Sequence, residues 1–395
     1  MHGGCRPLIA ASPRLHELHR ARGVPAAPVN ASAPMHVSES GASSRPGHFS
    51  PGDILIRADR LLPPRSASEP QGRRCGRPGL ALASLCCLAL LAAAPAFAQT
   101  AIVLNSGEGT ISLVDMAARK ETARIPIGKE PHHLMATPDD KHLIVANAVS
   151  NNMVFLDPDS GQPGRRIERI SNPYQIGYSP DRKYFVSASF RLNQTDIYEA
   201  ATFKLVKRIA TPKTPSHIAF DAGSSLTFIT LQDSNEVAAI DLATQKELWK
   251  VKVGPVPAGI WMTPDDKHLL VGLTGADGVD VIDWRKPAVV QRIVTGKGAH
   301  NFLPMGDKRH LLITNRVENT VAVIDMNKLA VVEKFSVPGG PDCMELTRDG
   351  KELWVTSRWI QKVSVVDMAT KKVIAQIPVG RSPHGIYFRG HAPRQ

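Results

Sequence analysis

The sequence repeats itself every 42 residues, and this period constrains the fold more than any other feature. A proline recurs at each step except one, where alanine stands instead: Pro131, Pro173, Pro215, Pro257, Ala299, Pro341 and Pro383. An acidic column keeps the same spacing: Asp115, Asp157, Glu199, Asp241, Asp283, Asp325 and Asp367. Self-similarity at a fixed period of this length is typical of repeat architectures. We therefore predict seven copies of one structural unit.

Each unit is expected to be a meander of four short strands. In the first complete copy, "LMATP", "HLIVANA", "MVFLD" and a segment around "RRIERI" are apolar or alternating runs of four to seven residues. Pro, Asp, Asn and Gly separate these runs, and such residues pre-set or tolerate the dihedral angles of tight turns. Between the second and third strands the recurring residues are Gly109, Asn151, Asn193, Asn235, Asp277, Asn319 and Gln361.

A four-stranded meander of about 40 residues cannot bury both of its faces alone, so the units must pack around a closed ring. We number the blades 1 to 7 from the proline that begins each one. Residues 101–127 supply only three strands, and the missing first strand is "HGIYF" near the C-terminus. The predicted fold is an all-β, seven-bladed β-propeller with four-stranded antiparallel blades, in which N-terminal and C-terminal strands together complete the last blade.

The repeats resemble a known family. "IPIGKEPHHLMATPDDKHLIVAN", "NTVAVIDMNKLAVVEKFSVPGGPDCMELTRDGKELWVTS" and "IPVGRSPHGIYF" are similar to the YVTN-type repeats of YncE-like exported bacterial propellers. The resemblance covers residues 100–389 and is specific for the fold. Relatives with this fold include surface-layer proteins, lactonases and propellers similar to the haem d1 domain, so the resemblance leaves the activity open.

The chain before the propeller differs in composition. Residues 1–78 are interpreted as an extension that is disordered or that precedes the true start of translation. Arg73, Arg74 and Arg77 come before an apolar core, and residues 79–98 are read as the remaining part of a signal peptide, cleaved after Ala98 in Ala-Phe-Ala. A membrane anchor is the alternative, but the apolar run is shorter than the roughly 20 residues of a spanning helix. We expect a periplasmic or secreted domain over 99–395, without membrane attachment after cleavage.

Charge and cysteine content exclude further classes. Residues 1–98 hold 11 Arg and five acidic residues, which leaves 99–395 with 37 basic and 31 acidic side chains. That mild excess shows no basic block with interleaved aromatic residues, so no nucleic acid is expected as a partner. Cys343 is the single cysteine of 99–395, which excludes an internal disulfide there.

The residues that follow the proline column are the candidate site. The first position holds His132, Tyr174, Ser216, Ala258, His300, Asp342 and His384, and the second holds His133, Gln175, His217, Gly259, Asn301, Cys343 and Gly385. Five of the nine histidines of 99–395 lie in these fourteen positions. Because these residues begin the innermost strands, they are expected to surround the mouth of the central channel. His300, Asp342, His384 and His132 come from four consecutive blades and should form an arc.

Three uses of these histidines remain open. They could cap a water-filled channel by bonding loop carbonyls, act as acids and bases, or bind a ligand. For the last use, we predict His132, His300, Asp342 and His384 as ligands of zinc, another transition metal or a haem-like cofactor. His133, His217, Asn105, Asn147 and Asn315 are the predicted cofactor-contacting residues, the asparagines because polar residues end the second strands on the same side of the ring.

The predicted function is a monomeric, non-enzymatic binding or assembly module, with a small ligand or a protein partner at the histidine-bearing mouth. The alternative is an enzyme, either a metal-dependent hydrolase of the lactonase type or a cofactor-using oxidoreductase. In that case the same four residues would be ligands, and His133 or His217 would be the general base.

Overall fold

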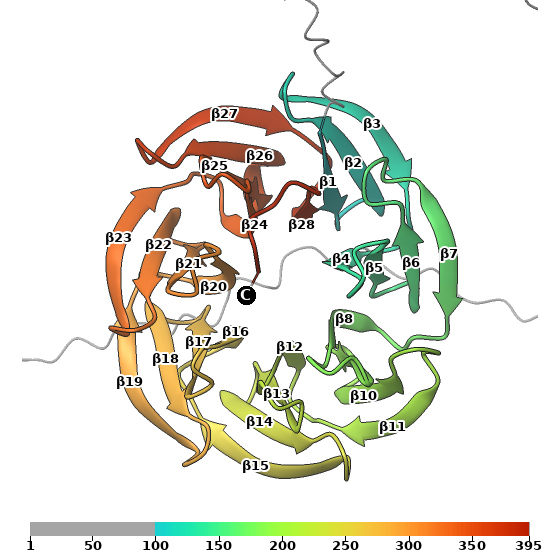
Figure 1. Cartoon of the computed structure of the whole chain (residues 1–395), viewed down its shortest axis with the longest axis vertical. Helices are drawn as coiled ribbons and strands as arrows, with labels where there is room; N and C mark the ends of the chain where they lie inside the picture. The colour runs from blue at the N-terminus through green and yellow to red at the C-terminus, as the bar shows by residue number, and fades with distance from the viewer. Residues whose placement is uncertain (1–98, 395) are drawn as a thin grey trace, which may run out of the picture. The chain divides into compact units, whose positions relative to one another are not determined.

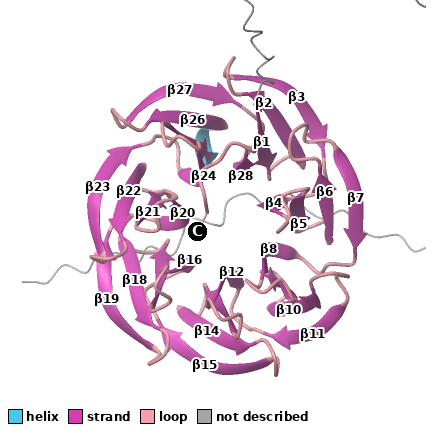
Figure 2. Cartoon of the chain, in the orientation of Figure 1, coloured by secondary structure: helices cyan, strands magenta, loops and turns pink. Residues whose placement is uncertain are grey.

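The computed structural model describes residues 99–394, which form seven four-stranded antiparallel sheets around a central axis (Figure 1). The prediction of a seven-bladed propeller is confirmed. The extension, the signal peptide and its cleavage site lie outside the described residues. Figure 2 shows that strands and short loops make up nearly all of the ring. Within 99–394, no helix is long and apolar enough to cross a membrane.

The strands take four positions in each blade. The first, innermost strands are β28 (Pro383–Tyr387), β4 (Pro131–Ala136), β8 (Pro173–Tyr178), β12 (Pro215–Phe220), β16 (Pro257–Met262), β20 (Ala299–Pro304) and β24 (Pro341–Leu346). The second strands are β1 (Thr100–Asn105), β5 (Leu143–Asn147), β9 (Tyr184–Ser189), β13 (Leu226–Leu231), β17 (His268–Leu273), β21 (His310–Asn315) and β25 (Glu352–Ser357).

The outer half of each blade completes the sheet. The third strands are β2 (Thr110–Asp115), β6 (Asn152–Leu156), β10 (Gln194–Glu199), β14 (Glu236–Asp241), β18 (Gly278–Asp283), β22 (Thr320–Asp325) and β26 (Lys362–Asp367). The fourth strands are β3 (Lys120–Pro126), β7 (Pro163–Glu168), β11 (Leu205–Ala210), β15 (Lys246–Lys252), β19 (Ala288–Val294), β23 (Ala330–Ser336) and β27 (Lys372–Pro378). A single turn of 3₁₀ helix, η1 (Arg358–Ile360), follows β25.

The ring closes as the sequence predicts, because β28 pairs with β1 in the order β28-β1-β2-β3. Antiparallel pairing aligns Ile102 with Tyr387 and Val103 with Ile386. The same strands contribute to the apolar packing between blades, where Trp354 of blade 6 packs near Val103 and Phe388. Closure therefore joins the two ends of the domain by backbone hydrogen bonds and by a buried core.

Turn chemistry explains the periodic polar columns. Asn319 adopts a left-handed conformation (φ 60°), and its side-chain oxygen accepts hydrogen bonds from the backbone N–H groups of Gly339 and Gly340. Asn151, Asn193 and Asn235 are also left-handed. The acidic column closes a different turn, since Asp367 Oδ1 accepts the Thr370 N–H at 2.7 Å. Both columns are structural.

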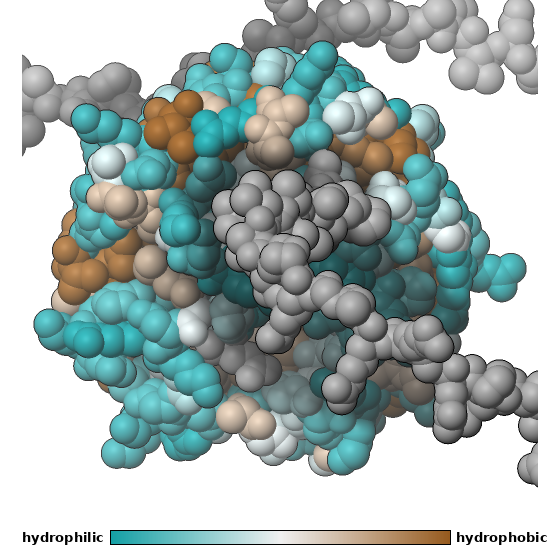
Figure 3. Space-filling view, turned by 45° about the horizontal axis from the view of Figure 1, so that its top comes forward, coloured by the Kyte–Doolittle hydropathy of each residue, from teal (hydrophilic) through white to brown (hydrophobic). Residues whose placement is uncertain are grey.

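The propeller has an upper and a lower face. The upper face carries the turns between second and third strands and the starts of the first strands, and the lower face is opposite. Hydrophilic residues cover most of the surface visible in Figure 3, with hydrophobic residues in separate small patches.

Candidate functional site

A bulge in each first strand places the residues after the proline column. In blade 6, Pro341 pairs with Ser357 and Met344 with Val355, so Asp342 and Cys343 together oppose one residue, Thr356. Such a bulge re-aims side chains and leaves a backbone N–H without a ladder partner. Thr356 Oγ1 accepts that N–H from Cys343 at 3.0 Å. Blade 5 repeats the arrangement, with Thr314 Oγ1 accepting the Asn301 N–H at 3.1 Å.

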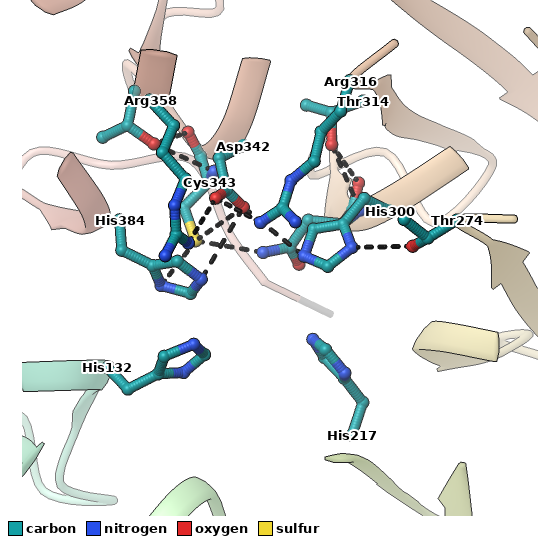
Figure 4. Close-up of polar contacts among 12 residues, drawn as sticks. His132, His217, Thr274, His300, Thr314, Arg316, Asp342, Cys343, Arg358 and His384 are labelled. Atoms are coloured by element: carbon teal, nitrogen blue, oxygen red, sulfur yellow. Dashed lines mark hydrogen bonds and ion pairs between the residues drawn. The ribbon is translucent and has the colours of Figure 1, made fainter. Parts of the chain in front are cut away.

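His300, Asp342 and His384 converge at the upper mouth of the channel (Figure 4). Asp342 Oδ1 lies 3.6 Å from His300 Nε2 and 3.7 Å from His384 Nε2. One potential ligand atom from each of the three residues lies within 4.8 Å of the others, and all three side chains are buried. We call these three residues the triad. Ring closure thus brings together consecutive blades 5, 6 and 7, as the spacing predicts.

The second ring nitrogen of each triad histidine has a partner. His300 Nδ1 is 3.0 Å from Thr274 Oγ1, and His384 Nδ1 is 3.5 Å from Cys343 Sγ. In contrast, both Nε2 atoms are buried without a hydrogen-bond partner. Neighbours at Nδ1 fix the orientation of both rings, as partners of the second ring nitrogen do in metal-ligating histidines.

Asp342 is the electrostatic centre of the site. Arg316 donates to its Oδ2, and Arg358 Nη1 lies 3.1 Å from the same oxygen (Figure 4). Burial opposes ionisation of Asp342, but Arg316 and the neighbouring cationic groups hold its pKa well below the usual value. Asp342 is therefore a carboxylate that uses one oxygen for arginine and directs the other toward the two histidines.

Burial keeps the histidines neutral. It lowers the pKa of His384 to about 4 and that of His300 well below its ordinary value, with nearby arginines acting in the same direction. His217, whose ring centroid is 5.4 Å from that of His300, has a pKa lowered to about 3 by burial. Neutral imidazole is the form that binds metals.

His132 lies beside the triad rather than within it. Its ring centroid is 4.0 Å from that of His384 and 3.6 Å from that of Tyr174, against which it stacks. His132 Nδ1 lies 3.2 Å from the Tyr174 carbonyl oxygen. Of the four predicted metal ligands, the structure thus brings His300, Asp342 and His384 close together. It places His132 against His384 with the two rings tilted at 40° to each other.

The predicted cofactor-contacting residues separate into two groups. His133 and His217 line a cavity of about 240 Å³ in the channel. Asn105, Asn147 and Asn315 are fully buried at the ends of second strands and do not line it. Asn147 donates to the Ile127 carbonyl of the preceding loop at 3.1 Å, and Asn105 donates to Ser112 Oγ of its own sheet at 2.8 Å. These contacts brace the blades, so a cofactor role for the asparagines finds no support in their surroundings.

Several contacts around the triad come from one column that sequence reasoning did not use as a set. The residue directly after each second strand is Ser106, Ala148, Phe190, Gln232, Thr274, Arg316 and Arg358 in turn. Thr274 bonds His300, the two arginines bind Asp342, and Phe190 stacks on Tyr174 with centroids 4.5 Å apart. Comparing this column with the histidine column would have predicted the arginine contacts, because the two columns lie side by side.

The fold and the site together define an all-β propeller with a histidine and carboxylate cluster at one mouth of its channel. The chain belongs to the YNCE-like beta-propeller family, whose model matches residues 73–394. The family resemblance of the repeats is thereby confirmed. No curated protein matches the chain.

Solved structures show the same architecture. A functionally unknown protein from Desulfotomaculum acetoxidans DSM 771 is similar with a TM-score of 0.63 and 17% identity, over 73% of this chain and 98% of that one. The dihydro-heme d1 dehydrogenase NirN, solved in complex with DHE, gives a TM-score of 0.56 and 14% identity over 74% and 75%. Hydrazine synthase of Kuenenia stuttgartiensis gives 0.55 and 17% over 64% and 87%. At these identities the likeness concerns the fold.

Proposed function

We propose that this chain is an exported, non-enzymatic binding module that holds a transition-metal ion at His300, Asp342 and His384. The observation that carries the proposal is the pair of buried Nε2 atoms without partners, both directed at one carboxylate oxygen. Buried polar atoms in native proteins are nearly always satisfied, so two orphans at one point indicate a missing partner.

The spacing of the ligand atoms supports a metal. Ligands at about 2.1 Å from a tetrahedral zinc ion are separated from one another by roughly 3.4 Å. The two separations of 3.6 and 3.7 Å at Asp342 Oδ1 are close to that value. Imidazole nitrogens with one carboxylate suit zinc and other first-row metals better than calcium or magnesium.

Charge sets a limit on the affinity. Arg316 and Arg358 already place two positive charges on Asp342, and a divalent ion would add to them. Metal binding therefore costs electrostatic repulsion, which the neutral histidines do not relieve. We expect an affinity below that of a structural zinc site built from thiolates.

Export and partner choice rest on sequence. The basic and apolar segment of 73–98 is the basis for proposing a periplasmic or secreted protein. The mild charge of 99–395 is the basis for expecting no nucleic-acid partner, and a monomer remains a prediction. A haem-like cofactor or a protein docked at the mouth is the other form of the binding hypothesis. The tight burial of the triad favours a single ion over a large ligand at that point.

The enzyme hypothesis has one specific observation in its favour. Three protein ligands leave a fourth position open, which is typical of catalytic rather than structural zinc sites. His217 is near enough to His300 to be considered as a base. A metal-loaded protein that hydrolyses lactones, or that turns over a redox cofactor, would establish this alternative.

Metal analysis of the purified full-length chain tests the proposal. We expect about one zinc, copper or similar ion per chain after loading, and loss of at least tenfold in affinity in His300→Ala and His384→Ala. His268→Ala is the matched control, because His268 begins β17, away from the triad, and should bind like wild type. No stoichiometric metal in the wild type, or equal binding by all four proteins, would contradict the proposal.

A further inference from the structure

A chamber lies in the channel directly below the triad. Its volume is about 240 Å³, and its wall includes His133, His217 and Cys343. Cys343 Sγ is 3.5 Å from the ring of His384, and His217 is in edge contact with His300. An ion or small molecule in this chamber is therefore next to the triad. The chamber holds polar groups and has space for several water molecules.

The triad is covered on its upper side. The exposed fractions of His300, Asp342 and His384 are 2%, 0% and 3%. Arg316 and Arg358 lie on Asp342, and their side chains are only 17% and 26% exposed. A ligand arriving from the upper face would have to displace this ion-paired arginine layer.

The last described residues of the chain reach the lower end of the chamber, where Arg394 is part of the wall. After β28 the chain runs toward the middle of the ring (Figure 1). It then pairs with the end of β24: the Ala392 N–H donates to the Leu346 carbonyl, and the Arg348 N–H donates to the Gly390 carbonyl, both at 2.8 Å. An isolated bridge joins Thr347 to His391. We call residues 389–394 the terminal segment.

Arg394 anchors the last described residues of the terminal segment. Its guanidinium binds the carboxylate of Glu345, which is 1% exposed, and it lies 5.5 Å from the ring centroid of Tyr387. Arg394 is itself part of the chamber wall. The Arg394–Glu345 ion pair thus holds this part of the segment at the opening.

The strength of this attachment is limited. The terminal segment is held by the two backbone hydrogen bonds of the Thr347–His391 bridge, by the ion pairs Arg394–Glu345 and Arg389–Asp159, and by the burial of Ala392. These contacts are few, and local opening of such a segment costs less than global unfolding. The arginine layer on the upper side, by contrast, belongs to two different blades and to short loops between paired strands.

We propose that the terminal segment is a lid, and that ions or small molecules reach the triad from the lower face when the Glu345–Arg394 pair opens. The identity of what enters rests on the proposed metal-binding function. The lid itself does not, because the accessibility of the chamber can be measured without any metal.

The rate at which the Cys343 thiol reacts with a small reagent measures how accessible the chamber is. The full-length chain is treated with iodoacetamide, a small neutral reagent, and the modification of Cys343 is followed by peptide mass spectrometry. We expect Arg394→Ala to increase its rate at least tenfold over wild type. Asp342, Arg316 and Arg358 are the charges that act on the pKa of Cys343, so loss of Arg394 changes access to the thiol rather than its acidity.

Control variants distinguish opening of the terminal segment from a loss of packing throughout the domain. Arg348→Ala leaves the backbone hydrogen bond to Gly390 in place and should react like wild type. Arg394→Lys keeps the positive charge and should react at a rate between those of wild type and Arg394→Ala. A chain that stops before Pro393 removes the anchor without a buried substitution and should react as fast as Arg394→Ala. Circular dichroism confirms that each variant is folded.

The experiment can contradict the lid proposal and the metal proposal separately. If Arg394→Ala and the shortened chain melt like wild type and modify Cys343 within twofold of its rate, the terminal segment is not a lid. If both react faster but neither they nor wild type take up zinc in competition with a chromophoric chelator, the lid stands and the metal proposal fails. Faster zinc uptake in the lid variants supports both statements.

Discussion

Asp342 connects most of the charged groups at the upper mouth. One of its oxygens binds Arg316 and Arg358, and the other faces His300 and His384. A carboxylate at this depth is stable because two guanidinium groups compensate it, and each arginine in turn depends on it. The residue therefore stabilises the mouth even before any ligand is considered.

Replacing Asp342 by Asn should destabilise the protein by about 3 kcal/mol, because it leaves two largely buried arginines without their counter-charge. Urea unfolding at pH 7 measures the change. Asp159→Asn is the control, since Asp159 pairs with Arg389 at an exposed site and should cost less than about 1 kcal/mol. Equal stabilities of the two variants would show that the arginines do not depend on Asp342.

Glu345 should make stability depend on pH. Burial raises its pKa from 4.5 to about 7, although Arg394 acts in the opposite direction. A raised pKa means that its contribution is fully present below about pH 4.5 and is lost as the pH rises through 7. Relative to wild type, Glu345→Gln should therefore gain about 2 to 3 kcal/mol between pH 5 and pH 8. Unfolding of both proteins across this range tests the prediction, and parallel curves would contradict it.

At the scale of the strand, two local devices build the site. The bulge at the start of the first strands makes two residues face one, and a threonine of the second strand accepts the released N–H. The left-handed asparagine turn fixes the loop that leads into the next blade. The sequence shows the asparagine column as a repeating position. It does not show the bulge, because residue types alone do not indicate which residues pair across two strands.

Substitutions at Asn319 test how much the left-handed asparagine turn contributes to stability. Asn319→Ala should cost about 1 to 2 kcal/mol, because alanine is strained at positive φ and cannot accept the two N–H groups of the following loop. Asn319→Gly removes the strain but also the acceptor, so it should cost less. Thermal or urea unfolding ranks the three proteins, and a glycine variant that is less stable than the alanine variant would contradict the explanation.

At the scale of the whole molecule, closure by β28 determines whether the ring forms. Tyr387 and Phe388 are 2% and 0% exposed, and they belong to the packing on either side of β1. Loss of this strand would expose both β1 and the apolar faces of the neighbouring blades. The shared blade thus couples the two ends of the domain into one cooperative unit.

Shortening the chain at two places tests closure. A chain that stops before Pro383 should lose its cooperative unfolding transition, because β28 is absent. A chain that stops after Phe388 keeps β28 and lacks only the terminal segment, and it should retain a cooperative transition near that of wild type. Calorimetry distinguishes the two, and a cooperative transition in the shorter chain would mean that closure is dispensable.

The sequence by itself determined the number of blades, the strand order, the closure and the arc of His300, Asp342 and His384. It could do so because equal repeats without insertions place equivalent residues on a ring at regular intervals. Only the tertiary structure decided that His132 lies beside the triad, that Arg316 and Arg358 share Asp342, and that Arg394 reaches Glu345. Those contacts depend on bulge geometry and on the path of a non-repeating end, and neither has a period from which to infer it.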